Sequence, residues 1–172
     1  MNSDRCIHFK VLGGGGEIGA NCYEISYAHE HILLDCGVHP KKEGFDSLPS
    51  FDLMESFPDA VLVTHGHEDH IGATPYVLRQ VPIPLYGTKL TLALVELKLK
   101  EHRISGIPLN VIKAGDTITL GGFSVEFIHV NHSIAGAVSM AITCSAGTLV
   151  VTGDFKIDYT PIEGTVTDLA TF

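Results

Sequence analysis

Residues 64–70, with the sequence Thr-His-Gly-His-Glu-Asp-His, are the part of the chain whose residue types could best do chemistry. Three histidines and two acids fall within six residues, directly after the apolar run 60–63. Imidazole nitrogens and carboxylate oxygens are the ligands that zinc accepts, and a hydrolytic zinc site also leaves a position for water. The segment therefore predicts a metal-dependent hydrolytic site at the end of a buried strand.

The spacing within this segment predicts two pairs of ligands. His65 and His67 stand at i and i+2, so their side chains point the same way if the segment is extended. Asp69 and His70 open the apolar segment 71–77, which predicts the first turn of a helix. One short loop would then serve two adjacent metals. The alternative is a polar loop that is histidine-rich by chance in a chain with ten histidines, but the order of strand, ligands and helix argues against it.

Two histidines follow one another at the end of the predicted strand 123–130, and both could bind metal. His132 lies past the strand end, where ligands usually come from. His129 shares a strand face with Val125 and Phe127, which favours a packed core histidine. His102, at the polar end of a predicted helix, is expected to be a surface cation.

Two acids stand at predicted strand ends, Asp35 after the apolar run 32–34 and Asp154 after the run 148–151. Either acid alone predicts no more than a cap at the end of a strand. In a chain that also carries the histidine-rich segment, Asp154 is the natural bridging carboxylate between two metals.

The elements that must position these residues are mainly strands, joined by short turns. Strands are predicted at 6–12, 21–27, 32–35, 60–63, 83–86, 123–130, 137–143 and 148–151, with two more flanking a turn at 113–116. Helices are predicted over 71–80 and 89–102, both covering one side. The second helix has a broad apolar face that we expect to lie in the core, formed by Leu90, Leu92, Leu94, Val95, Leu97 and Leu99.

The glycine-rich segment 13–19 contains a G-x-G-x-x-G pattern, the fingerprint of dinucleotide-binding loops. That fingerprint requires a helix to begin inside the loop. Residues 21–27 instead alternate and are rich in aromatic and β-branched types, so they predict a hairpin with 32–35. We therefore favour a tight turn beneath the metal site, with amides that face an anionic substrate.

Length and composition fit one domain of a soluble globular protein, with 172 residues, 45% hydrophobic and 18% charged. No apolar run approaches the roughly 20 residues of a membrane span, and no secretion signal is evident. The four cysteines are scattered, which favours free buried thiols in a cytoplasmic protein. A net charge of −9 argues against a basic nucleic-acid-binding surface, although bound cations would cancel part of it.

The motif of residues 64–70 is the signature of the metallo-β-lactamase superfamily. Within it, four blocks resemble the ribonuclease J family of the β-CASP branch: 12–19, 64–72, 132–134 and 152–161. Blocks 35–40 and 43–49 are closer to the related mRNA 3′-end cleavage endonucleases. The resemblance covers nearly the whole chain. It implies an α+β fold, an αββα sandwich, of which residues 1–172 would be the N-terminal portion.

The resemblance also implies six ligands for two zinc ions: His65, His67 and His132 for the first, Asp69 and His70 for the second, and Asp154 between them. Asp35 would orient the metal-binding loop by hydrogen bonds without binding metal. The implied activity is hydrolysis of RNA phosphodiester bonds, exo- or endonucleolytic, by a bridging hydroxide. Asp69, His70 and Asp154 would be the catalytic residues, with Asp69 as a carrier of protons.

The chain departs from the family in two ways. The superfamily's second metal takes a further histidine from the far C-terminal part of the fold, and no motif for it follows Asp154. The β-CASP domain, which clamps the RNA, has no counterpart either. We therefore expect the N-terminal part of a longer enzyme, or a truncated relative. An unfinished sandwich would expose sheet edges and favour association into a homo-oligomer.

Two other functions fit the same ligands. One is a metallo-hydrolase that acts on a small thioester or lactone, and the other is a non-catalytic metal-binding module. The block 152–156 and the glycine-rich loop favour the nuclease, with RNA as partner and no membrane.

Overall fold

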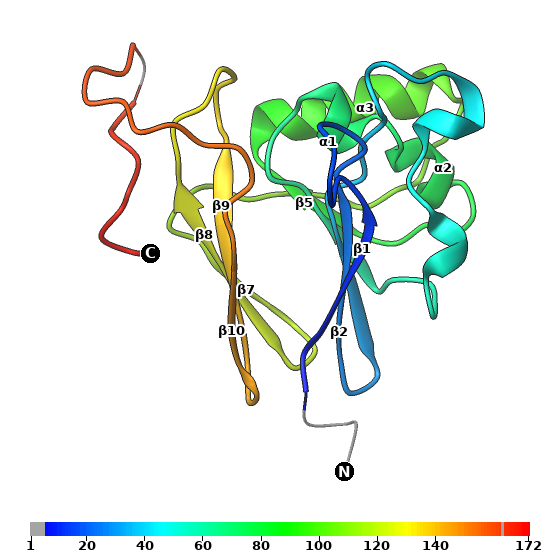
Figure 1. The fold of residues 1–172 in the computed structure, drawn as a ribbon, viewed down its shortest axis with the longest axis horizontal. Helices are drawn as coiled ribbons and strands as arrows, with labels where there is room; N and C mark the ends of the chain where they lie inside the picture. The colour runs from blue at the N-terminus through cyan, green and yellow to red at the C-terminus, as the bar shows by residue number, and fades with distance from the viewer. Residues whose placement is uncertain (1–5, 163) are drawn as a thin grey trace.

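The computed structural model describes residues 6–162 and 164–172, which form two β-sheets packed face to face (Figure 1). The first sheet holds β1 (His8–Gly13), β2 (Cys22–Tyr27), β3 (Glu30–Leu34), β4 (Ala60–Leu62), β5 (Leu85–Gly87) and β6 (Leu109–Val111), in that order. The second holds β10 (Gly147–Val151), β9 (Val138–Cys144), β8 (Phe123–His129) and β7 (Thr117–Leu120). The predicted α+β class is confirmed.

The first sheet changes from antiparallel to parallel at β3. Strands β1, β2 and β3 pair antiparallel, while β4, β5 and β6 continue the sheet in parallel register. Strands β2 and β3 form the predicted hairpin, with Tyr27 opposite Glu30. Because a strand and not a helix follows the glycine-rich loop, the dinucleotide-binding alternative is excluded.

The predicted turn at 113–116 is confirmed between β6 and β7. These two strands belong to different sheets, so the turn carries the chain from one layer to the other. The second sheet is antiparallel throughout, and β8 and β9 run together from Ser124 opposite Thr143 to His129 opposite Val138. Strands β8 and β10 therefore run parallel to each other on either side of β9 and end at the same edge of the second sheet.

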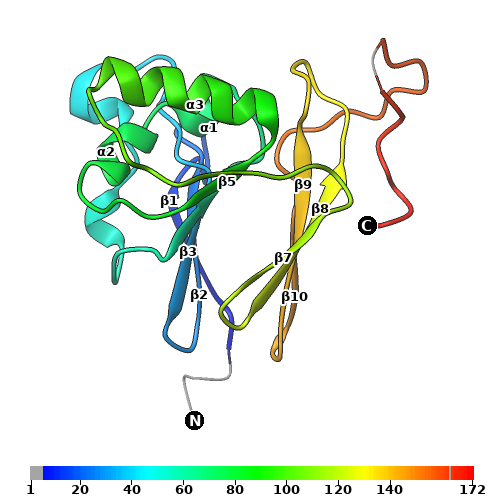
Figure 2. The same ribbon diagram turned by 180° about the vertical axis from the view of Figure 1, so that it is seen from behind.

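Three α-helices lie on the outer face of the first sheet, with two short 3₁₀ turns nearby (Figures 1 and 2). They are α1 (Glu68–Ile71), α2 (Thr74–Leu78), α3 (Lys89–Glu101), η2 (Gly44–Ser47) and η3 (Phe51–Leu53). The prediction of one helix over 71–80 is wrong, because the chain breaks between α1 and α2. Pro75 stands in the first turn of α2, and its ring would clash with the carbonyl of Ile71 in a continuous helix.

Two apolar cores hold the layers together. One lies between the sheets, around Phe123, Phe127 and Met140, and the other lies between the first sheet and the helices. The prediction that the whole apolar face of α3 is core is wrong for Leu90 and Leu97, which are 41% and 56% exposed. A helix that lies on a single sheet buries one stripe only, and these two residues flank that stripe.

Among the described residues, no helix covers the outer face of the second sheet, so three of the four expected layers are present (Figure 2). Outward positions on this sheet are largely polar and exposed, for example Ser124, Glu126, Thr143 and Thr148. Such alternation is typical of an antiparallel sheet with one face in solvent.

No helix in the described part of the chain is long and apolar enough to span a membrane. The four cysteines are free, as predicted. Cys22 and Cys36 are buried and Cys6 is exposed, so the prediction of buried thiols is right for the first two and wrong for Cys6.

Candidate metal centre

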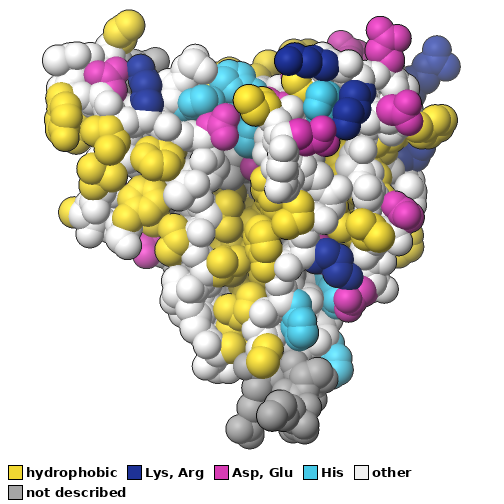
Figure 3. All heavy atoms as spheres, viewed as in Figure 1, with side chains coloured by type: hydrophobic (Ala, Val, Ile, Leu, Met, Phe, Trp, Pro, Cys, Tyr) yellow, Lys and Arg dark blue, Asp and Glu magenta, His cyan; other side chains and the backbone are white. Residues whose placement is uncertain are grey.

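The candidate site lies where the ends of both sheets meet. Strand β4 is fully buried between parallel neighbours, and the chain leaves it at Thr64 to enter the histidine-rich loop. The backbone N–H of Val138, at the start of β9, donates to the carbonyl of Thr64 at 3.0 Å, which ties the two sheets together at this edge. Figure 3 shows histidine side chains gathered at this end of the molecule, between the two halves.

Three histidines converge through their ring nitrogens. Nε2 of His65 lies 3.1 Å from Nδ1 of His67, and Nε2 of His132 lies 3.2 Å from the same atom. A tetrahedral ion with Zn–N bonds of about 2.05 Å would hold two such nitrogens about 3.3 Å apart. The spacing of the three rings therefore fits a metal at their centre.

A second group shares His65 with the first and adds His70 and Asp154. The Asp154 carboxylate lies between the two groups, with Oδ1 3.7 Å from Nε2 of His70 and Oδ2 3.6 Å from Nε2 of His132. Asp69 lies at the edge of this group, its Oδ2 being 3.8 Å from Nε2 of His70. The structure thus brings together all six residues that the sequence singled out as ligands.

Asp35 lies behind the histidines and is 1% exposed. It accepts hydrogen bonds from the backbone N–H of Thr64 at 2.8 Å, from the Thr64 hydroxyl at 2.9 Å and from Nδ1 of His70 at 2.8 Å. Since the Thr64 hydroxyl donates to Asp35, it accepts from Nδ1 of His65, 3.0 Å away. Both rings then carry their proton on Nδ1, which leaves the Nε2 lone pairs facing the site.

The backbone at Asp35 has a φ of 51°, in the left-handed region that non-glycine residues seldom adopt. The next residues pair with the metal loop, since the N–H of Cys36 donates to the carbonyl of His70 at 2.7 Å. This backbone pairing holds the strand end and the loop in a fixed relation.

Asn21 is a site residue that the sequence analysis missed. Its side-chain amide lies 3.2 Å from the carbonyl of Asp69, 3.4 Å from the Asp69 carboxylate and 3.0 Å from Nε2 of His70. The Tyr23 hydroxyl donates to the other end of the Asn21 amide at 3.1 Å. Asn21 directly follows the glycine-rich loop, and only the tertiary fold brings it to Asp69.

The predicted tight turn is present in the glycine-rich loop, which closes on itself just before Asn21. A Cβ at Gly13 would lie 2.1 Å from the carbonyl oxygen of Ala20, so only glycine fits there. The closure sets Asn21 against the metal loop, which gives the glycines a structural purpose beside the site.

The pKa values of the histidines at this site are shifted in different directions. Burial, helped by the neighbouring His70, lowers the pKa of His65 to about 3. Burial and the other histidines also lower the pKa of His132. Burial acts to lower the pKa of His70 too, but the charge and hydrogen bond of Asp35 outweigh it and raise this pKa above 6.5. His65 and His132 are thus neutral near pH 7, as ligands must be, whereas His70 holds a proton more tightly.

We expect zinc affinity to rise with pH because a metal on His70 must displace its proton. The raised pKa of His70 means that this proton competes below and around neutral pH, so the affinity should fall as the pH drops from about 8 to about 6. Titration calorimetry in two buffers of different ionisation enthalpy would measure both the affinity and the proton release on binding. An affinity independent of pH over this range would contradict the expectation.

Gly37 is packed against the metal loop so closely that no side chain fits. A Cβ at this position would lie 1.6 Å from the carbonyl oxygen of Asp69 and 2.6 Å from the nitrogen of His70. Gly37→Ala should therefore displace the loop and lower the free energy of unfolding by about 3 kcal/mol. Urea unfolding of the metal-free protein checks this. Gly16→Ala is the matched control, since a Cβ there meets nothing within 4 Å, and equal stability of the two variants would contradict the prediction.

The two remaining histidine predictions have different outcomes. His129 lies outside the cluster, but the prediction that it is packed in the core is wrong. It is half-buried, and its Nε2 donates to the carbonyl of Thr165 at 2.9 Å, because the C-terminal segment crosses the end of β8. His102 also lies outside the cluster, which agrees with the prediction that it is no ligand. It is partly buried and contacts the Tyr76 ring edge-on, with 5.5 Å between the ring centroids.

Comparison with known proteins agrees with this fold. The family described as the metallo-beta-lactamase superfamily matches residues 15–169. The chain therefore belongs to the metallo-β-lactamase superfamily, a fold that implies a bound metal.

Among individual relatives, the chain is 39% identical to ribonuclease J of Helicobacter pylori over 98% of its own length. It is 41% identical to ribonuclease J of Mycobacterium tuberculosis over 92% of its length. The chain spans only 26% and 30% of these two relatives.

Solved structures match at the level of the fold. A protein of unknown function from Enterococcus faecalis V583 superposes with a TM-score of 0.68 at 21% identity, over 88% of this chain and 44% of that one. The metallo-beta-lactamase fold protein YhfI from Bacillus subtilis gives a TM-score of 0.61 at 21% identity, over 85% of this chain and 61% of that one.

Proposed function

We propose that this chain carries the catalytic metal centre of a zinc-dependent ribonuclease, similar to ribonuclease J and of the β-CASP branch, that hydrolyses RNA phosphodiester bonds. The observation that carries the proposal is the convergence of two ligand groups, one of three histidines and one of two histidines with Asp154, on adjacent points. Similarity to two proteins named ribonuclease J supports RNA as the substrate.

In this proposal His65, His67 and His132 would hold one zinc, Asp69 and His70 would hold the second, and Asp154 would be a ligand shared by both. Zinc in these positions would act as a Lewis acid towards the phosphate and supply a nucleophile from water near neutral pH.

The residues around the proposed ligands orient their side chains by hydrogen bonds. Asp35 and Thr64 keep the Nε2 lone pairs of His65 and His70 turned towards the site. Asn21 donates to the Asp69 carboxylate at the rim of the site. We assign to Asp69 the role of carrying a proton between water and the leaving oxygen. Asp154 has a half-exposed side chain, so a substrate can reach the space beside it.

The test is hydrolysis of a 5′-labelled RNA by the zinc-loaded protein, run beside a panel of small thioesters and lactones. Cleavage of RNA alone supports the proposal, and the length of the labelled products separates removal of nucleotides from the 5′ end from internal cutting. Hydrolysis of the small substrates with intact RNA would favour the small-molecule hydrolase. Zinc binding without any hydrolysis would favour the non-catalytic module.

A further inference from the structure

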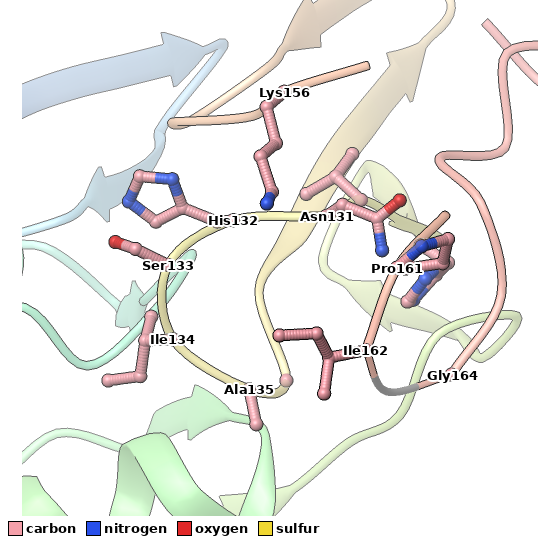
Figure 4. A pocket seen from close by; sticks show the side chains of 12 residues that line it. Asn131, His132, Ser133, Ile134, Ala135, Lys156, Pro161, Ile162 and Gly164 are labelled. Carbon is pink, nitrogen blue, oxygen red and sulfur yellow. The ribbon is translucent and has the colours of Figure 1, made fainter. Parts of the chain in front are cut away.

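A cavity of about 450 Å³ lies against the metal centre on the side of the second sheet (Figure 4). The loop 131–136 forms its floor, and Lys156, Pro161 and Ile162 stand on the other sides. His132 lines this cavity and also belongs to the three-histidine group, so the cavity lies next to the centre. Its size is within the range of pockets that bind small ligands.

Lys156 is the feature that points to a ligand. Figure 4 shows its amine directed into the cavity, between the side chains of His132 and Asn131. The lysine is held by its backbone, because its N–H donates to the Asn131 carbonyl at 2.8 Å and its carbonyl accepts from the Thr167 hydroxyl at 2.8 Å. The backbone of Lys156 is therefore fixed beside the cavity.

The amine of Lys156 is only partly engaged. It donates to the Asp158 carboxylate at 2.9 Å, and Asp158 is itself held by the N–H of Thr160 at 2.9 Å. A lysine ammonium has three donors, and no other described residue accepts from it. With respect to the described residues, two donors therefore remain for a ligand in the cavity.

The lining of the cavity differs from the rest of this acidic chain. Among its described lining residues, the charged or titratable ones are Lys156, His129 and His132, with no carboxylate. Ile134, Pro161 and Ile162 are the apolar residues of its lining. A cation with apolar neighbours matches a nucleotide, whose phosphate is anionic and whose base is largely apolar on its faces.

We propose that this cavity is the subsite for the nucleotide next to the scissile bond, and that Lys156 holds its phosphate. The inference rests on the proposed ribonuclease function and adds a positioning residue to it. Asp158 weakens the attraction of Lys156 for a phosphate, since its carboxylate occupies one donor of the amine and repels an incoming phosphate.

The test is binding of a fluorescein-labelled single-stranded RNA to the protein in EDTA, which prevents cleavage, measured by anisotropy over a range of salt concentrations. Lys156→Gln should weaken binding roughly three- to tenfold and lower the slope of log Kd against log salt by about 0.7, the value for one phosphate contact on a single strand. Lys156→Arg should restore most of the slope.

Asp158→Asn should change affinity in the opposite direction, with RNA bound at least about twofold tighter, because the lysine loses its competing anion. A merely structural role of the Lys156–Asp158 pair would make both variants weaker. Lys100→Gln is the matched control, since Lys100 also pairs with an acid, Glu96, but belongs to α3 and does not line this cavity. It should change neither affinity nor slope.

The outcomes separate the two proposals. If the wild type binds RNA and Lys156→Gln leaves affinity and slope unchanged, the subsite is wrong and the ribonuclease proposal stands. If both Lys156→Gln and Asp158→Asn weaken binding equally, the subsite is also wrong. A wild type that neither binds RNA in EDTA nor cleaves it with zinc overturns the ribonuclease function and the subsite together.

Discussion

Replacing His67 by alanine is expected to remove metal from the three-histidine group. Its Nδ1 is the atom to which both other rings come close, at 3.1 Å from His65 and 3.2 Å from His132. Without this nitrogen, only the ring nitrogens of His65 and His132 remain as ligands in the group. Zinc affinity should fall by more than the roughly 100-fold that is lost when only a partner of a ligand is removed. Under the proposed ribonuclease function, RNA hydrolysis should fall to background.

The measurement is zinc content per chain by elemental analysis, together with competition against a chelator. His8→Ala is the matched control, because His8 is exposed on β1 and belongs to no ligand group. The control should keep wild-type zinc. A His67→Ala protein that retains wild-type zinc content and affinity would contradict the assignment of this centre.

Asp154→Ala tests the second metal separately. Its carboxylate lies between His70 and His132, so in the proposed dinuclear centre its loss should release the second zinc while the three histidines keep the first. A wild type with about two zinc ions per chain and a variant with about one is the expected result. Loss of all zinc in this variant would mean that the two positions fill only together.

The cluster of candidate ligands could be predicted from the sequence because its chemistry is concentrated in short segments. His65, His67, Asp69 and His70 lie in one loop after an apolar run, and the strand-and-loop order fixes where that loop sits. His132 and Asp154 were found by a weaker rule, that strand ends collect functional residues. The rule worked here because β8 and β10 end at the same edge of their sheet, where the start of β9 between them bonds to Thr64 just after β4.

The residues that support the ligands could not be predicted in the same way. Asn21 and Gly37 reach the site only because the segments around them pair with the metal loop, a contact between parts of the chain far apart in sequence. The exposure of Leu97 depends on how much of α3 the sheet covers, which periodicity alone does not determine. The break between α1 and α2 is different, since Pro75 signals it locally.

Asp35→Asn should show how much metal affinity depends on the orientation and tautomer of the histidines, because Asp35 contacts them without being a proposed ligand. Asparagine tolerates the left-handed backbone at this position and nearly matches aspartate in shape. Its amide nitrogen, however, would face groups that now donate to the carboxylate, Nδ1 of His70 and the Thr64 hydroxyl. His70 would be driven to carry its proton on Nε2, the atom that must bind metal. Zinc affinity should fall roughly 10- to 100-fold.

Stability should fall as well, by about 2 kcal/mol in the metal-free protein, because a buried, charge-assisted hydrogen bond is lost. Chelator competition measures the first effect and urea unfolding the second. Asp59→Asn is the matched control, since Asp59 accepts from the backbone N–H of His31 at 2.8 Å in an exposed setting away from the ligand groups. If Asp35→Asn destabilises the fold but binds zinc with wild-type affinity, Asp35 supports the chain and does not orient the ligands. Weaker zinc binding in Asp35→Asn, with Asp59→Asn unchanged, would show that the tautomers of the buried histidines, and not only their positions, determine whether this centre holds metal.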